Sequence, residues 1–93
     1  MSKFISELQL LKPNDAAQST SEMKDYQGRQ WDFITTAGHG YLVVPKTSMY
    51  YNLACKIVEY GFKGSFAVYL EEDCEIGEFF GRLPQCEAIH SVV

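Results

Sequence analysis

Residues 66–80 read FAVYLEEDCEIGEFF, and this stretch lies at the centre of the predicted fold. Residues 66–70 are apolar apart from the Tyr69 hydroxyl, which predicts a strand that is covered on both faces. Asp73 can cap a helix that continues to about Phe80. Five of the twelve acidic residues fall within eight positions here, with no lysine or arginine among them: Glu71, Glu72, Asp73, Glu75 and Glu78.

A β-hairpin is predicted upstream of this stretch. Residues 31–36, WDFITT, alternate between two faces, which is the period of a strand. The glycines within residues 37–40 permit the positive φ of a tight hairpin turn. Residues 41–44 then predict the return strand, which Pro45 ends.

A helix is predicted between the hairpin and the strand at residues 66–70. Thr47 or Ser48 can cap its start, and Gly61 lies where a helix-ending glycine belongs. Apolar residues recur through this segment at helical spacing, which predicts one buried helix face: Tyr50, Leu53, Ala54, Ile57 and Val58.

The first thirty residues divide into a helix and a polar segment. Residues 1–12 predict a peripheral amphipathic helix, which could dock on its own sheet, a second copy or a partner. Residues 13–30 contain only two large apolar residues and predict a polar linker or arm. The compact α+β domain is expected to span residues 31–93. The apolar side of the helix is formed by Phe4, Ile5, Leu8 and Leu11.

Together these elements predict an α+β fold with a small three-stranded sheet, a crossover helix, a C-terminal helix and the N-terminal helix at its periphery. A helix after the second strand runs back along the sheet. The third strand is therefore expected parallel to the second and beside the first, in the order 2-1-3. The turn at His39 and the acids at residues 71–73 would then lie at opposite ends of the sheet, about 16 Å apart.

Length, charge and cysteine content limit the function classes. Ninety-three residues are enough for one domain. A net charge of −4 disfavours direct binding to nucleic acid and favours a protein partner with a basic patch. The sequence shows no signal peptide, membrane span, cofactor motif or metal motif, so a cytoplasmic protein with no membrane contact is expected. The three cysteines predict free thiols, and carboxylates near Cys74 are expected to keep it unreactive.

Two short motifs carry a family resemblance. Residues 36–40 read TAGHG, which fits T-x-G-H-G, and residues 69–74 read YLEEDC, which fits Y-x-E-E-D-C. With the strand that begins at Trp31, they resemble a group of small uncharacterised phage and plasmid domains. That group carries a Trp-led strand, a T-x-[SG]-H-G turn, a helix and a later Y-E-E-D-C segment.

The chain departs from that pattern at two positions. Tyr41 replaces a second glycine after the turn, and Leu70 precedes the acids. The resemblance covers residues 31 to about 83. It implies a mobile-element setting, in which compact acidic proteins often act by binding and blocking host machinery.

Six residues form the predicted partner-binding site. The acids can be explained structurally, since a carboxylate in the first turn of a helix contributes about 0.3–1 kcal/mol, or functionally, as acceptors for a partner's arginines. Met49, Tyr50 and Tyr51 are consecutive, so they cannot all face inward from one helix. We expect Tyr51 to be exposed, as an aromatic contact of a type that is enriched in interfaces. The histidine is either a turn residue or a group that titrates near neutrality. The predicted site consists of Glu71, Glu72, Asp73, Glu75, Tyr51 and His39.

The leading hypothesis from sequence is a non-catalytic, acidic phage or mobile-element protein that binds a host protein in the host cytoplasm and modulates or blocks it, as an anti-defence inhibitor would. One alternative is a small metal-dependent hydrolase, or one that uses His39 as its base. A second alternative is a structural or assembly protein that forms a homodimer through the N-terminal helix.

Overall fold

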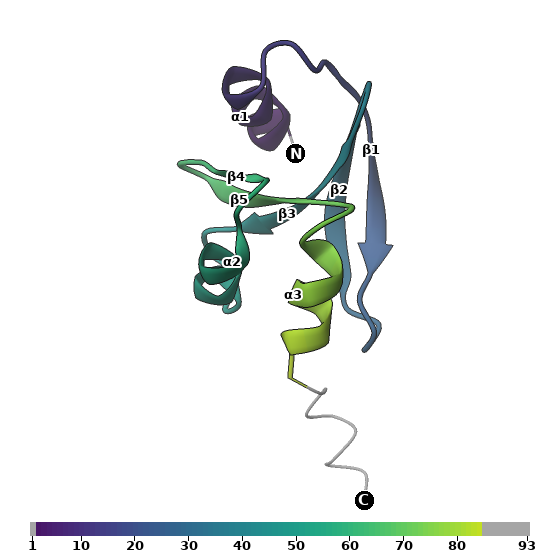
Figure 1. Cartoon of the computed structure of the whole chain (residues 1–93), viewed down its shortest axis with the longest axis vertical. Helices are drawn as coiled ribbons and strands as arrows, with labels where there is room; N and C mark the ends of the chain where they lie inside the picture. Colours follow the sequence, from purple (N-terminus) through teal and green to yellow (C-terminus); the bar gives the residue numbers. More distant parts are fainter. Residues whose placement is uncertain (1, 85–93) are drawn as a thin grey trace, which may run out of the picture.

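The computed structural model describes residues 2–84, which form three helices and one five-stranded sheet (Figure 1). Every pair of neighbouring strands is antiparallel. The predicted α+β class is confirmed, whereas the predicted three-stranded sheet is wrong. Residues 85–93, the end of the predicted compact domain, lie outside the described part. The elements are α1 (Ser2–Leu11), β1 (Ala17–Lys24), β2 (Gln30–Thr36), β3 (Gly40–Pro45), α2 (Tyr51–Ile57), β4 (Phe62–Lys63), β5 (Ala67–Glu71) and α3 (Ile76–Arg82).

The strand order is β1-β2-β3-β5-β4, so the predicted order 2-1-3 is wrong. The hairpin of β2 and β3 is present as predicted, with Thr35 opposite Gly40. The next long strand, β5, pairs with β3 rather than with β2, and it runs antiparallel. The physical reason is β4, which reverses the chain once more after α2 and therefore also reverses the direction of β5.

Strand β1 occupies the segment that the sequence predicts as a linker. It pairs with β2 from Ala17 opposite Thr36 to Lys24 opposite Gln30. An edge strand needs no alternation of apolar residues where both of its faces meet solvent, and residues 19–22 are all exposed. The polar composition that suggests a linker is thus the composition of an exposed edge strand.

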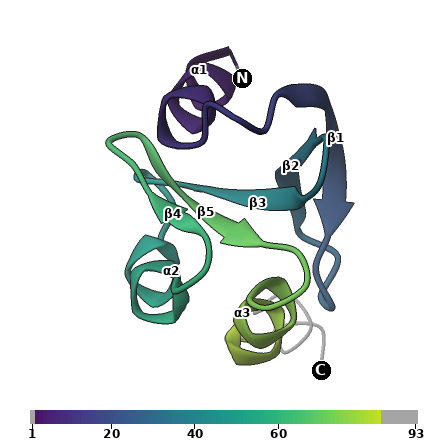
Figure 2. The ribbon, with the colours of Figure 1, turned by 45° about the horizontal axis from the view of Figure 1, so that its top comes forward.

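Helix α1 packs on the chain's own sheet. Phe4 and Leu8 are buried against Ile34, Tyr41 and Tyr69. Figure 2 shows α1 on one side of the sheet and α2 and α3 on the other. Two of the four residues of the apolar stripe that could drive dimerisation are therefore buried within the chain, whereas Ile5 is half-buried and Leu11 is 37 % exposed.

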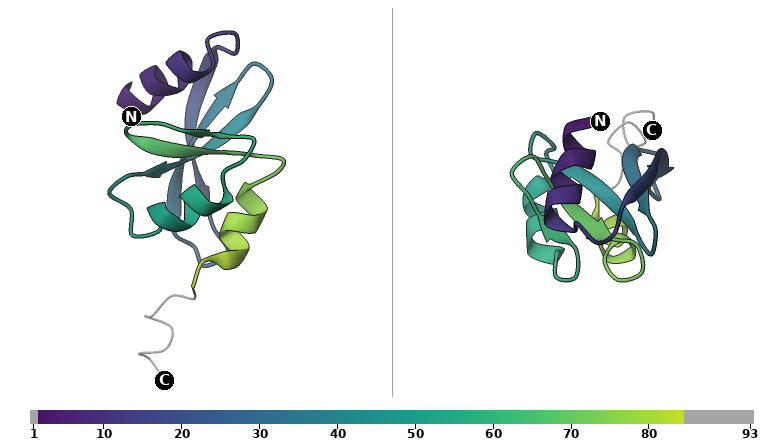
Figure 3. Two further views of the ribbon diagram at one scale, coloured as in Figure 1. Left: turned by 60° about the vertical axis from the view of Figure 1, so that its left-hand side comes forward. Right: turned by 90° about the horizontal axis from the view of Figure 1, so that it is seen from above.

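Two apolar layers enclose the sheet, because successive residues of a strand point to opposite faces. In β3, Tyr41 and Val43 face α1, whereas Leu42 and Val44 face α2 and α3. Helices α2 and α3 lie side by side on their face (Figure 3). None of the helices in residues 2–84 is long and apolar enough to cross a membrane.

The crossover helix is shorter than the sequence suggests. Helix α2 ends at Ile57, and Val58 is extended. Gly61 is not the glycine that ends the helix. It lies so close to β5 that an added Cβ would be 1.9 Å from the Tyr69 carbonyl oxygen. This close approach lets residues 58–61 turn into β4.

Candidate protein-binding site

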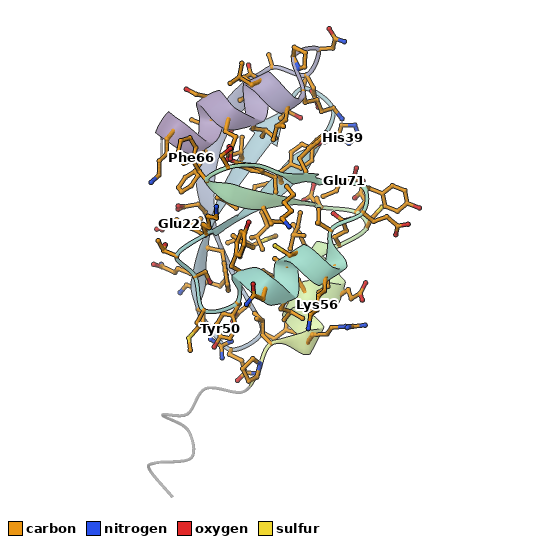
Figure 4. All side chains as sticks on the ribbon, turned by 90° about the vertical axis from the view of Figure 1, so that its left-hand side faces the viewer. Glu22, His39, Tyr50, Lys56, Phe66 and Glu71 are labelled. Atoms are coloured by element: carbon orange, nitrogen blue, oxygen red, sulfur yellow. The ribbon has the colours of Figure 1, made fainter. Side chains whose placement is uncertain are left out.

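The acids after β5 lie beside the turn that contains His39. Glu71 pairs with Tyr41 across the sheet, and the Glu72 N–H donates to the Gly40 carbonyl oxygen at 2.9 Å. Figure 4 shows His39 and Glu71 on the same side of the molecule. The predicted placement at opposite ends of the sheet was wrong, because it assumed a parallel third strand.

Gly40 makes this arrangement possible. A Cβ at this position would lie 2.3 Å from the Phe33 ring and 3.0 Å from a carboxylate oxygen of Glu72. Only a glycine therefore lets the end of β3 come this near to both neighbours.

The turn that contains His39 is held by a buried carboxylate. Asp15 accepts hydrogen bonds from the Thr36 hydroxyl at 2.7 Å and from the Gly38 N–H at 3.1 Å. The bond from Thr36, opposed by burial and assisted by Gly38 and Lys12, keeps the pKa of Asp15 below its ordinary value. The His39 N–H donates to the Thr36 hydroxyl oxygen at 3.0 Å. The His39 side chain is exposed, so this turn presents an imidazole on a fixed backbone.

Glu75 has a structural position rather than a surface position. It is 3 % exposed and accepts backbone N–H bonds from Tyr60 at 2.6 Å, Gly61 at 3.0 Å and Glu71 at 3.0 Å, together with one from Glu59. This carboxylate therefore ties the turn after α2 to the end of β5. Its carboxylate lies beneath the surface and is used by these bonds, so it is not counted in the exposed surface, and its predicted contact with a partner stays a prediction.

The remaining acids do meet solvent. Glu72 and Asp73 are exposed, and Glu71 is half-buried. Helix α3 begins at Ile76, so Asp73 does not cap it as predicted; Glu75 occupies the cap position and makes no side-chain cap bond. The charges of Glu72 and Asp73 are thus not explained by helix capping.

Cys74 lies within this acidic turn. Its thiol donates to a carboxylate oxygen of Glu71 at 3.3 Å. This hydrogen bond, with burial and the nearby charges of Asp73 and Glu75, raises the pKa of Cys74. The direction agrees with the predicted unreactive thiol.

A different tyrosine from the predicted one stands exposed here. Tyr51 is half-buried and packs against the core between the sheet and α2. Tyr60 is 62 % exposed, and its backbone N–H donates to the Glu75 carboxylate. The two glycines that flank Phe62 and Lys63 are the sequence signal for this turn, because they favour a hairpin after a short helix.

These contacts define an acidic end of the molecule, formed by His39, Tyr60, Glu71, Glu72 and Asp73. Within residues 2–84 no group of three histidine, cysteine or acidic side chains is placed to hold a metal ion. The acidic end offers carboxylates that accept hydrogen bonds from arginine or lysine, and Tyr60 adds an exposed aromatic ring on a turn that is joined to β5 through Glu75. No protein-family model matches the sequence, and comparison with curated proteins and solved structures also gave no match.

Proposed function

We propose that the protein is a non-catalytic binding protein whose acidic end takes a basic segment of a partner protein. The observation that carries this proposal is the exposure of Glu72 and Asp73 next to the turn that contains His39, where the Glu72 N–H donates to the Gly40 carbonyl oxygen at 2.9 Å. Tyr60 is also exposed. The turn that contains Tyr60 and the turn that begins at Glu71 are held by the same buried carboxylate, that of Glu75, which accepts the backbone N–H groups of both residues. A binding surface fixed before contact loses little conformational entropy on association.

The chemistry of the acidic end favours arginine in the partner. A guanidinium can donate two hydrogen bonds to one carboxylate and can also stack on an aromatic ring. Hydrogen bonds to charged groups contribute about 1.5–3 kcal/mol each when they are sheltered from water.

The resemblance to phage and plasmid domains indicates which class of partner to test first. In that setting the partner is a host protein in the host cytoplasm, and occupying its basic patch would block it. A basic patch that normally contacts nucleic acid or another anionic surface is the natural target of such an inhibitor.

The test begins with the partner recovered from host lysate, which is then purified and titrated against defined variants. Reversal of all three acids, E71K/E72K/D73K, is expected to weaken binding by about 100-fold or more, because each lost contact is charge-assisted. The single change Asp73→Lys gives a matched comparison with Glu78→Lys, since each alters the net charge by two.

Glu78 lies on α3, is 47 % exposed at its side chain and pairs only with Arg82 at 2.9 Å among the described residues. Glu78→Lys is therefore expected to bind nearly as the natural chain does. Equal binding by the triple variant would mean that the acids serve only the fold, and it would refute the proposal.

A further inference from the structure

A groove opens where β2 and β3 separate. Their pairing extends only to Asp32 opposite Val43. Beyond that pair β2 continues with β1, whereas β3 continues to Pro45 with β5. The separation leaves a cavity of about 490 Å³, closed on its third side by Met49 and Tyr50 of the loop before α2.

Two carboxylates face each other at this groove. Glu22 of β1 and Asp32 of β2 are directly opposite in the antiparallel pair, and both line the cavity. Like charges directly across a sheet destabilise it. Within residues 2–84 neither side chain forms an ion pair. The carboxylates of Glu22 and Asp32 therefore give the groove two negative charges that no ion pair among residues 2–84 offsets, beside an apolar wall.

The only cation that lines the groove among the described residues is already neutralised. Arg29 pairs with the buried carboxylate of Asp25 at 3.1 Å and donates to the Pro84 carbonyl oxygen at 2.5 Å. Its guanidinium also lies 5.3 Å from the centre of the Tyr50 ring. The groove wall is thus compatible with a guanidinium. The charges of Arg29 and Asp25 offset each other, so Glu22 and Asp32 leave the groove with a net charge of about −2.

The apolar part of the wall suits the stem of a long basic side chain. Pro45 and Met49 line the groove; Pro45 is half-buried and Met49 is 84 % exposed. Arginine side chains bury their methylene groups on apolar surface while the charged head meets an acceptor. A flexible methionine adapts its shape to such a guest.

We propose that this groove binds an arginine side chain of a partner polypeptide, with the guanidinium at Glu22 and Asp32 and the methylene groups along Pro45 and Met49. The site is separate from the acidic end: Glu22 and Tyr50 lie on the side of the molecule opposite His39 and Glu71 (Figure 4). Along β3, Gly40 at the acidic end and Val43 opposite Asp32 are three residues, or roughly 10 Å, apart. Binding of arginine at the groove can therefore be tested independently of binding at the acidic end.

The direct test is a titration with a capped Gly-Arg-Gly tripeptide, followed by NMR. Trp31 is the single tryptophan and lines the groove, so its indole N–H signal is an unambiguous reporter. Saturable shifts are expected at this signal and at the amides of Glu22 and Asp32. The matched control peptide has citrulline in place of arginine, which keeps the shape and removes the charge. Its affinity should be lower than that of the arginine peptide by about tenfold or more.

Variants of the protein locate the site. E22Q/D32N is expected to weaken binding of the arginine peptide by about tenfold, whereas E78Q should leave it unchanged. Because the double change removes a like-charge pair, the variant should melt no lower than the natural chain, so a loss of binding is not a loss of fold.

Three results would overturn the proposal. They are equal binding of the arginine and citrulline peptides, unchanged binding by E22Q/D32N, and shifts confined to residues 71–73. The last of these would assign arginine binding to the acidic end alone and would leave the proposed function standing.

Discussion

At the scale of single residues, this chain uses its carboxylates in two opposite ways. Glu75 and Asp73 are two positions apart, yet the first is buried and accepts four backbone N–H bonds while the second points into solvent. Composition could not distinguish them, because the difference depends on the turn at residues 59–61, which is distant in sequence. The sequence thus identified the acidic surface but included a residue that serves the fold.

Replacement of Glu75 by alanine should therefore destabilise the protein. The change leaves several buried N–H groups without an acceptor, each at a cost of about 1–3 kcal/mol, and part of that cost is recovered by water entering the turn. We expect a loss of about 3 kcal/mol in the free energy of unfolding, measured by urea denaturation.

Glu78→Ala is the matched control, and its effect should stay within about 0.5 kcal/mol because its ion pair is exposed. If the two alanine variants unfold at the same urea concentration, Glu75 does not hold the two turns together.

At the scale of elements, the sequence was informative where side chains alternate or follow a helix stripe. The hairpin of β2 and β3 and the apolar face of α1 were predicted on that basis and are present. Strand β1 was missed because both of its faces meet solvent over residues 19–22, and β4 because two residues carry no period. The error in topology follows from both missed strands: β4 reverses the direction of β5, and β1 occupies the edge of β2 where the third strand was expected.

Helix α1 offers a test of whether the N-terminal segment belongs to the domain. Leu8 is fully buried against the sheet, whereas Leu10 on the same helix is 83 % exposed. Leu8→Ala should cost about 3 kcal/mol, because it removes buried methyl groups and leaves a cavity. Leu10→Ala should change stability by less than about 0.5 kcal/mol.

Thermal or urea unfolding of the two variants measures both effects, and the identical chemical change makes each a control for the other. If Leu8→Ala does not lower the stability, α1 is not packed on the sheet. The hypothesis that the chain dimerises through the apolar stripe of α1 would then have to be tested again.

At the scale of the whole molecule, buried carboxylates join segments that the local sequence does not connect. Glu7 of α1 accepts hydrogen bonds from the Tyr69 hydroxyl at 2.8 Å and from the Phe66 N–H at 3.0 Å. Asp25 accepts bonds from the Trp31 indole N–H at 3.0 Å and from the backbone N–H groups of the β1–β2 turn. The Asp25 bonds are local, since Trp31 is only 6 positions away. The Glu7 bonds could not be predicted, because they join α1 to partners 59 and 62 positions away that only the fold brings near.

Both groups, with Asp15, link the stability of the whole chain to pH. Burial raises the pKa of Glu7, but the hydrogen bonds from Tyr69, Phe66 and Ser65 outweigh it and hold the pKa below its ordinary value of 4.5. Burial likewise raises the pKa of Asp25, and the bonds from Trp31 and the turn again lower it below 3.8. A carboxyl whose pKa is lower in the folded chain than in the unfolded chain binds fewer protons when folded.

Stability should therefore be constant from about pH 7 to pH 5 and fall once the pH drops below about 4.5, where the unfolded chain begins to take up protons that the folded chain excludes. The loss continues down to the lowered pKa values of the folded state. Urea unfolding between pH 3 and pH 7 measures this loss of stability.

The variant Glu7→Gln should be less stable at neutral pH and show a shallower fall of stability on acidification, because one of the three linked groups no longer titrates. Glu72→Gln is the exposed control and should keep the slope of the natural chain. If stability instead rises on acidification, repulsion among the surface acids outweighs the buried bonds, and the buried carboxylates do not govern the stability of the fold.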